Sequence, residues 1–589
     1  METKPDIYGW CGRILKIDLN DGSHHTEQID NALYRKFIGG RGLAGYFLRP
    51  FITLPWNDNA MPLLLFTGPL VNTISPTSGR MTIMSRSPLT GAVGDCSVGG
   101  SLGTEIKKAG WDGIIITGKS DFLCGLEIIN DEIKIVEAKQ YTGWGTAATH
   151  QAINKKGATA VIGPAAENDV LFSSVIVDGH YAAGRGGIGL SFAIKNIKYL
   201  TVRGDKNTFI FDGPALKKSR ADVMRLVSAS PALMGEQGIA RFGTGALYDL
   251  IDARTMMPTD NFRKSIFDRA SKMNAFAYQQ RYHPHNTGCR GCPVLCKKET
   301  AADLILPEFE TMSHFSALID NDNLEAVTEA NRICNDLGMD TISAAATLAC
   351  YAEISSLKIT PEMLFSLLHD IGHIRGVGAE LAEGSYRYAL RRGRPETSMT
   401  VKKLELPGYD PRGAYGMALS YAVSTRGGCH LRAYPISHEI LRKPVATDRF
   451  TFDGKARIIK TAEDLNAAVD SLTACKFLFF AASLEEYAQV FSAITGLQSS
   501  AEDLFRAGER IYYQEKLMNA ANGFSQVDDD LPKRFFNDDS RKDDRIVLKA
   551  INRNDFYQAR ANYYRIRGLN EGGLPTKEKA AELGLLWKV

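Results

Sequence analysis

Arg13-Ile-Leu-Lys-Ile-Asp-Leu19 alternates apolar and polar side chains along most of its length, which is the period of a β-strand with one buried face. A hairpin is predicted further along, because Leu126-Glu-Ile-Ile129 and Ile133-Lys-Ile-Val136 are separated by the turn-forming pair Asn130-Asp131. More than half of the 54 glycines lie in residues 1–205, as expected for strands joined by tight turns. These features predict a β-rich first domain.

The hydrophobic period becomes that of helices after about residue 206. Leu324, Val327 and Ile333 fall on one helical face. Gly338 ends this helix, and Asp340 is placed to cap a second one. The predicted fold class is therefore α+β, with a β-rich domain over residues 1–206 followed by two mostly α-helical domains over residues 207–400 and 401–589.

Composition and charge exclude several classes of protein. The 70 basic and 67 acidic side chains give a net charge of +3, so the chain lacks the basic surface of a nucleic-acid binder. Its longest apolar run, residues 61–66, is far shorter than the ~18 residues that cross a bilayer. We expect no nucleic-acid partner and no membrane span. The N-terminal residues lack an apolar signal core, which predicts a cytoplasmic protein with reduced cysteines.

The most specific local pattern is the knuckle Gly288-Cys-Arg-Gly-Cys-Pro-Val-Leu-Cys296. It contains three closely spaced thiols: Cys289, Cys292 and Cys296. An iron–sulfur cubane needs a fourth thiolate, which Cys475 could provide from a distant segment. A zinc ion could instead be completed by His283 and His285. The knuckle alone leaves both centres open, together with the simpler alternative of buried thiols that bind no metal.

The stretch Gly40-Arg-Gly-Leu-Ala-Gly45 has the glycine spacing of a dinucleotide-binding loop. That spacing is meaningful only directly after a strand, and the preceding residues 30–37 have a helical pattern. We therefore expect a turn at a helix end here and no nucleotide site.

Short motifs run in order along nearly the whole chain, at residues 9–19, 37–43, 67–70, 85–91, 163–168, 182–189, 288–296, 335–340, 409–415, 425–431 and 531–536. Together they resemble the motifs of the tungsten-containing aldehyde:ferredoxin oxidoreductase family. The resemblance implies that the β-rich domain forms the base of a cofactor site. It further implies tungsten, or molybdenum, held by two pterins, a [4Fe–4S] cluster beside them and Mg²⁺ bridging the pterin phosphates.

The resemblance also implies roles for individual residues. The cluster ligands would be Cys289, Cys292, Cys296 and Cys475, which favours iron over zinc. The family's two pterin motifs correspond to residues 335–340 and 470–475, where Asn335 replaces an Asp and Thr473-Ala474 replaces Gly-Leu. The cofactor-binding residues implied are Arg80, Ser97, Arg185, Gly186, Asn335, Gly338, Asp340, Arg432, Asp470 and Ala474.

Among these, Arg80 would bridge cluster and pterin, because a guanidinium can donate hydrogen bonds in two directions. Arg185 and Gly186 would lie near the pterin phosphates, and the carbonyl oxygen of Ser97 would help to hold Mg²⁺. Asp340 and Asp470 would accept hydrogen bonds from pterin N–H groups, and Asp340 can also cap a helix.

The implied activity is oxidation of aldehydes to carboxylic acids, or the reverse, with electrons passed through the cluster to ferredoxin or a ferredoxin-like iron–sulfur subunit. His430 and either Glu308 or Glu310 would form the acid–base pair. One alternative within the family is an aromatic acyl-CoA reductase. The altered second motif favours another, a pterin-free iron–sulfur electron-transfer or scaffold protein. A homodimer or hetero-oligomer is expected.

Overall fold

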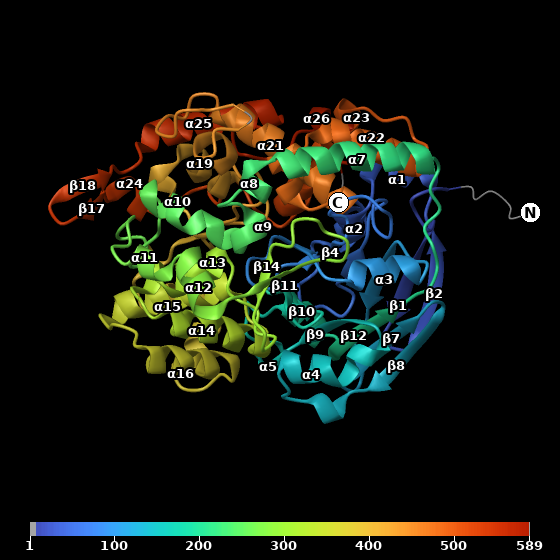
Figure 1. Ribbon diagram of the computed structural model, residues 1–589, viewed down its shortest axis with the longest axis horizontal. Coiled ribbons are helices and arrows are strands. Elements are labelled where there is room, and N and C mark those ends of the chain that lie inside the picture. The colour runs from blue at the N-terminus through green and yellow to red at the C-terminus, as the bar shows by residue number, and fades with distance from the viewer. Residues whose placement is uncertain (1–6, 444, 588–589) are drawn as a thin grey trace, which may run out of the picture.

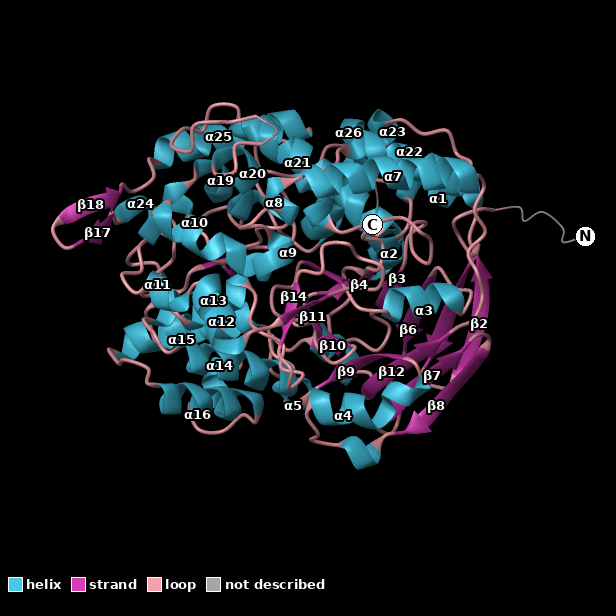
Figure 2. Cartoon of the chain, viewed as in Figure 1, coloured by secondary structure: helices cyan, strands magenta, loops and turns pink. Residues whose placement is uncertain are grey.

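Two six-stranded sheets form the first third of the chain in the computed structural model, which describes residues 7–443 and 445–587 (Figures 1 and 2). The first sheet has the order β2-β1-β6-β3-β4-β5 and the second β11-β10-β9-β12-β7-β8. Their strands are β1 (Arg13–Asp18), β2 (Ser23–Gln28), β3 (Leu63–Phe66), β4 (Met81–Arg86), β5 (Val93–Val98), β6 (Gly113–Thr117), β7 (Cys124–Ile129), β8 (Glu132–Glu137), β9 (Ala158–Ile162), β10 (Val175–Val177), β11 (Tyr181–Ala183) and β12 (Ile197–Arg203). Residues 1–6, on which the expected absence of a signal segment rests, lie outside the described range.

The alternation of side chains explains how the first sheet is covered on both faces. In β3, Leu63 and Leu65 belong to the core shared with the second sheet. Leu64 and Phe66 point the other way, into the core shared with the helices. The predicted hairpin is also confirmed, because β7 pairs antiparallel with β8 and Asn130 takes a left-handed conformation at the turn (φ 53°).

Helices make up most of the remaining chain (Figure 2). They cover the face of the first sheet that points away from the second sheet. The longer ones are α7 (Gly213–Ala229), α14 (Leu324–Leu337), α15 (Thr341–Ser355), α16 (Pro361–Gly372), α19 (Tyr415–Val423), α21 (Lys455–Leu472), α22 (Leu484–Thr495), α23 (Ala501–Ala521) and α25 (Arg553–Arg567). The predicted α+β class, with a β-rich domain before a helical region, is confirmed.

The ends of two helices place the expected pterin motifs. Helix α14 ends at Gly338 (φ 73°), and Asp340 caps α15 through the backbone N–H groups of Ile342 and Ser343, as predicted. Helix α21 ends in the same way at Thr473 (φ 58°), two residues before Cys475. The two motifs therefore share one geometry, although the second lacks the glycine that favours it.

The segment with the nucleotide-like spacing begins a helix, α2 (Gly40–Leu48). It is preceded by another helix, α1 (Asn31–Phe37), and not by a strand. The expected turn at a helix end lies just before the motif, at Ile38 (φ 65°), whereas residues 40–45 themselves are helical.

Candidate active site

One loop brings the cysteine knuckle and Cys475 together. The backbone N–H of Cys475 donates to the carbonyl oxygen of Thr77 at 3.0 Å. A methyl group added at Gly79, in the same loop, would lie 3.5 Å from the Cβ of Cys289. Burial, together with the smaller effects of negative charge on Cys475 and Cys289, raises the pKa of Cys292 to about 11. The four thiols thus form one electrostatically coupled group.

The two histidines of the zinc alternative have exposed side chains. His285 is on the hairpin β13 (His285–Thr287) and β14 (Lys297–Glu299), and its Nε2 is 3.4 Å from Glu299 Oε2. Its side chain is 59% exposed, and His283 is exposed as well. Within residues 7–443 and 445–587, no group of three or more His, Cys, Asp or Glu side chains is arranged to hold a single metal ion. The exposed imidazole of His285 is thus paired with a carboxylate.

Arg80 lies between the thiols and strand β5. Its Nε donates to Ser97 Oγ at 2.9 Å, and its Nη2 donates to the carbonyl oxygen of Ser97. Burial opposes its charge, but Cys475, Cys289 and the Asp470 carboxylate outweigh burial and raise the pKa of Arg80. A permanently charged guanidinium thus sits beside the thiol group, where it can stabilise negative charge.

Two glutamates at the start of α13 (Phe309–Phe315) have opposite environments. Glu308 Oε2 accepts a hydrogen bond from Lys297 Nζ at 2.7 Å. Burial opposes the charge of Glu308, but the Lys297 ammonium outweighs it and lowers the pKa of Glu308. Glu308 also raises the pKa of Cys296, so it lies on the thiol side of the site. Glu310, two residues later, points elsewhere.

Glu310 meets His430 from a distant segment. Glu310 Oε2 accepts from the backbone N–H of Gly408 at 2.7 Å, and its Oε1 is 3.4 Å from His430 Nε2. Burial raises the pKa of Glu310 to about 8, helped by the Asp340 carboxylate. Burial and the charge of Arg185 lower the pKa of His430 well below its usual value. Near neutral pH the pair is therefore a carboxylic acid beside a neutral imidazole.

Arg185 connects the β-rich part of the chain to this pair. Its Nη2 donates to the carbonyl oxygens of Glu405 at 2.6 Å and Gly428 at 3.3 Å. Its Nε lies 3.4 Å from Asp340 Oδ2. The next residue, Gly186, has φ 83°, and its carbonyl oxygen accepts from the Ser87 hydroxyl at 2.7 Å.

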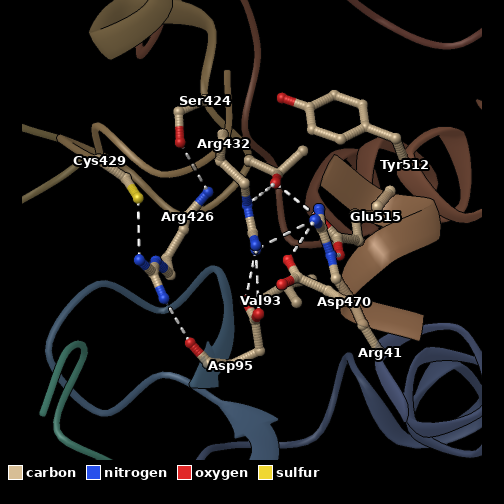
Figure 3. Close-up of polar contacts among 12 residues, drawn as sticks. Arg41, Val93, Asp95, Ser424, Arg426, Cys429, Arg432, Asp470, Tyr512 and Glu515 are labelled. Atoms are coloured by element: carbon tan, nitrogen blue, oxygen red, sulfur yellow. Dashed lines mark hydrogen bonds and ion pairs between the residues drawn. The ribbon is translucent and has the colours of Figure 1, made fainter. Parts of the chain in front are cut away.

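The second motif rests in a buried network of charges (Figure 3). Asp470 Oδ2 is 2.9 Å from Lys476 Nζ and 3.3 Å from Arg41 Nη1. Arg432 donates to both carboxylate oxygens of Asp95. The network sets four cations against three carboxylates: Arg41, Arg426, Arg432 and Lys476 against Asp95, Asp470 and Glu515. Such a surface suits an anionic ligand group.

A thiol accepts a hydrogen bond from one of these cations. Arg426 Nη2 donates to Cys429 Sγ at 2.8 Å, and its Nη1 donates to the carbonyl oxygen of Asp95 at 2.6 Å (Figure 3). Burial opposes ionisation of Cys429, but Arg426 and Arg432 outweigh burial and lower its pKa. Arg41 and Arg426 lie in motifs that the sequence singled out, but nothing in the sequence indicates that they meet Glu515 or Asp95, because this pairing depends on contacts between remote segments.

The site is rich in buried polar atoms with unused hydrogen-bonding capacity. Among the described residues, atoms without a hydrogen-bond partner include Glu310 Oε1, His430 Nδ1, Arg185 Nε, Arg426 Nε and Asp470 Oδ1. Most buried polar groups in proteins are paired, so this concentration indicates a polar ligand that binds among them. Donors, acceptors and cationic charge together fit a pterin with its amine edge and phosphate.

Other sequence-predicted residues contribute through the backbone. The carbonyl oxygen of Asn335 accepts from the Thr146 hydroxyl at 2.8 Å, at the contact of α14 with α4 (Thr146–Ile153). The backbone N–H of Gly338 donates to Asn335, and that of Ala474 donates to Val469, which closes the ends of α14 and α21. These contacts shape the two motifs.

Comparisons with known proteins identify the family of this chain. Residues 14–204 match the family model "Aldehyde ferredoxin oxidoreductase, N-terminal domain", and residues 218–585 match "Aldehyde ferredoxin oxidoreductase, domains 2 & 3". The "Tungsten-containing aldehyde ferredoxin oxidoreductase" of Pyrococcus furiosus is 35% identical over 98% of this chain and 99% of its own. The protein of the same name from Thermococcus kodakarensis is also 35% identical, with the same coverage.

More distant relatives have other activities in their names. An "Aliphatic sulfonate oxidoreductase, WOR-like subunit" of Pyrococcus furiosus is 26% identical over 98% of this chain and 97% of its own. The solved "Active site complex BamBC of Benzoyl Coenzyme A reductase in complex with 1,5 Dienoyl-CoA" has a chain of the same fold. That chain superposes with a TM-score of 0.82 at 21% identity, covering 98% of this chain and 97% of that one. No helix among the described residues is long and apolar enough to cross a membrane.

Proposed function

The chain belongs to the aldehyde ferredoxin oxidoreductase family, and from that premise we propose that it is a tungsten-pterin enzyme that oxidises aldehydes to carboxylic acids or catalyses the reverse reaction. The observation that carries the proposal is the Glu310–His430 pair beside buried, unpartnered polar atoms and a cationic network. An acid–base pair with no polar partner on its open side is suited to a reacting carbonyl and water.

Two groups of residues would hold the cofactors. Cys289, Cys292, Cys296 and Cys475 would ligate a [4Fe–4S] cluster, because such clusters take four thiolates. Asp340, Asp470, Arg185, Arg432 and the motif ends at Gly338 and Ala474 would hold the pterins. When bound, the metal–pterin centre would accept two electrons from the substrate and the cluster would pass them on singly to ferredoxin or a ferredoxin-like subunit.

Mg²⁺ at the Ser97 carbonyl fits less well. That oxygen already accepts a hydrogen bond from the Arg80 guanidinium. A divalent cation at the same oxygen would be repelled by this charge. The proposal therefore assigns no role in the reaction to Mg²⁺.

Aldehyde oxidation needs a water oxygen and releases protons, which this chain's own side chains can handle. Ionised Glu310 would take a proton at Oε1 from the water that adds to the carbonyl. A pKa near the working pH makes the carboxylate a base that can both accept and release this proton.

His430 responds to the protonation state of Glu310. When Glu310 is protonated, its hydroxyl faces His430 Nε2, and the hydrogen of the imidazole is then on Nδ1. Nδ1 is buried without a partner and would donate to the substrate oxygen. Burial and the positive charge of Arg185 keep the ring neutral, so the imidazole can act as a hydrogen-bond donor without becoming an imidazolium.

An anaerobic assay of the tungsten-loaded enzyme tests the proposal. It would follow formation of carboxylic acid from a panel of aliphatic and aromatic aldehydes together with reduction of a one-electron dye. We expect acid and two reduced dye molecules for each aldehyde consumed. If a loaded enzyme oxidised no aldehyde but reduced an aromatic acyl thioester, the alternative activity within the family would replace this one.

A further inference from the structure

The motif Gly40-Arg-Gly-Leu-Ala-Gly45 packs directly on the second pterin motif. The backbone N–H of Gly42 donates to Ser471 Oγ at 3.0 Å. A methyl group added at Gly40 would lie 2.5 Å from the carbonyl oxygen of Asp470 and 2.6 Å from Thr473 Cγ2. Only glycine permits this approach, so the spacing serves contact between the start of α2 and the end of α21.

Arg41 extends from this contact into the buried network. It is fully buried, and its Nε and Nη2 donate to the two carboxylate oxygens of Glu515 at 2.6 and 2.8 Å. Its remaining Nη1 donates to Asp470 Oδ2 at 3.3 Å. Figure 3 shows the guanidinium between the two carboxylates. The planar fork thus binds Glu515 on one edge and Asp470 on the other.

Glu515 is itself held firmly. Its Oε2 accepts from the Thr425 hydroxyl at 2.6 Å and lies 3.4 Å from Arg432 Nη2. It belongs to α23, which packs against α21. Arg41 is therefore anchored to a second helix, and its position does not depend on Asp470.

The two oxygens of Asp470 are used differently. Oδ2 faces Arg41 and Lys476, whereas Oδ1 is buried and has no hydrogen-bond partner in the described part of the chain. Asp470 is only 2% exposed, so water does not readily satisfy Oδ1. An oxygen left in this state is presented to a ligand.

We propose that Arg41 is a positioning residue for Asp470: it fixes Oδ2, so that Oδ1 faces the N–H edge of the second pterin. This inference rests on the proposed function, because it needs a pterin to be bound. A lysine at this position would keep the charge but could not span both carboxylates, since an ammonium has no planar fork.

The experiment compares Arg41→Lys with Arg567→Lys in anaerobically purified holoenzyme. Arg567 is a matched control, because it is also fully buried and pairs with Glu463 and Asp464 of the same helix, α21. The measurements are oxidised, fluorescent pterin released per chain, and bound iron. We expect R41K to lose at least about half of its pterin while keeping its iron, because the contact of Asp470 with the second of the two pterins is weakened. R567K should keep both.

A double variant separates positioning from general destabilisation. If Arg41 acts through Asp470, R41K combined with D470N should contain as much pterin per chain as D470N alone. Should R41K fail to fold, E515Q loosens the same anchor while leaving the guanidinium in place, and a partial pterin loss is expected. Pterin content in R41K or E515Q equal to that of R567K would overturn the inference. Wild-type protein without pterin would instead refute the proposed function.

Discussion

His430 Nε2 lies 3.4 Å from Glu310 Oε1, although Glu310 precedes α14 and His430 follows α19 in the chain. Their contact depends on Gly408, whose backbone N–H holds the other oxygen of Glu310. Burial shifts the pKa values of both residues toward the neutral forms, so Glu310 can gain and release a proton near neutral pH while the imidazole stays uncharged.

The two glutamates of α13 should differ sharply in their effect on catalysis. Glu310→Gln removes the group that exchanges the proton, so we expect kcat to fall by about 10²–10⁴-fold. Glu308→Gln removes a carboxylate paired with Lys297 and should alter kcat much less. Steady-state rates of aldehyde oxidation for both variants, normalised to tungsten content, provide the test. Equal losses would reject the assignment of Glu310.

The pH dependence of stability should report Glu310 directly. Its pKa is raised from 4.5 to about 8 in the folded protein, so the folded state keeps a proton that the unfolded chain releases. Stability from this group is fully present below pH 4.5 and is lost as the pH rises through about 8. Wild-type Tm should therefore fall relative to that of E310Q between pH 5 and 8. A constant Tm difference over this interval would contradict the raised pKa.

The absence of a side chain at Gly408 should be essential for the geometry of the Glu310–His430 pair. A methyl group there would lie 2.5 Å from Ser313 Oγ and 3.1 Å from Glu310 Oε2. Gly408→Ala should displace the carboxylate and lower kcat by up to about 10²-fold, since small misplacements are costly in catalysis. Gly213→Ala is the control, because nothing lies within 4 Å of the added methyl group at the start of α7. Comparable activity in the two variants would show that the pair tolerates movement.

Features that are determined by a hydrophobic period or by a helix-capping residue could be predicted from the sequence. The strand over Arg13–Asp18 and the cap at Asp340 depend on neighbouring residues, and both are as predicted. The strand is buried on both faces and not on one, because Ile14 and Leu15 belong to different cores. The choice between Glu308 and Glu310 could not be made, because it depends on which way each side chain leaves the first turn of α13. The domain boundaries at 206 and 400 remain predictions.

The buried charge network was beyond sequence reasoning for a related reason. Arg41 meets Glu515 and Asp470 only after α2, α21 and α23 have packed together. The glycines around Arg41 stand out in the sequence, but their spacing is that of a nucleotide-binding loop. The structure shows another reason for these glycines, because the backbone of α2 packs closely on the end of α21.

The altered second motif should depend on a single hydroxyl. Thr473 stands where the resemblance places a glycine. Its Oγ1 accepts a hydrogen bond from the backbone N–H of Gly68 at 3.0 Å. Thr473→Val keeps the shape but leaves that buried N–H without a partner, which costs about 1–3 kcal/mol of stability. Thr473→Ser retains the acceptor and should lose much less. Thermal unfolding of both variants decides the matter, and a T473V protein as stable as T473S would exclude the role of this hydrogen bond.

Four thiols and two pterin motifs should converge on one redox centre. The decisive measurement is elemental analysis of anaerobically purified protein together with pterin release. We expect about four iron atoms and one tungsten or molybdenum per chain, with pterin. Zinc without iron, or iron without pterin and tungsten or molybdenum, would contradict it.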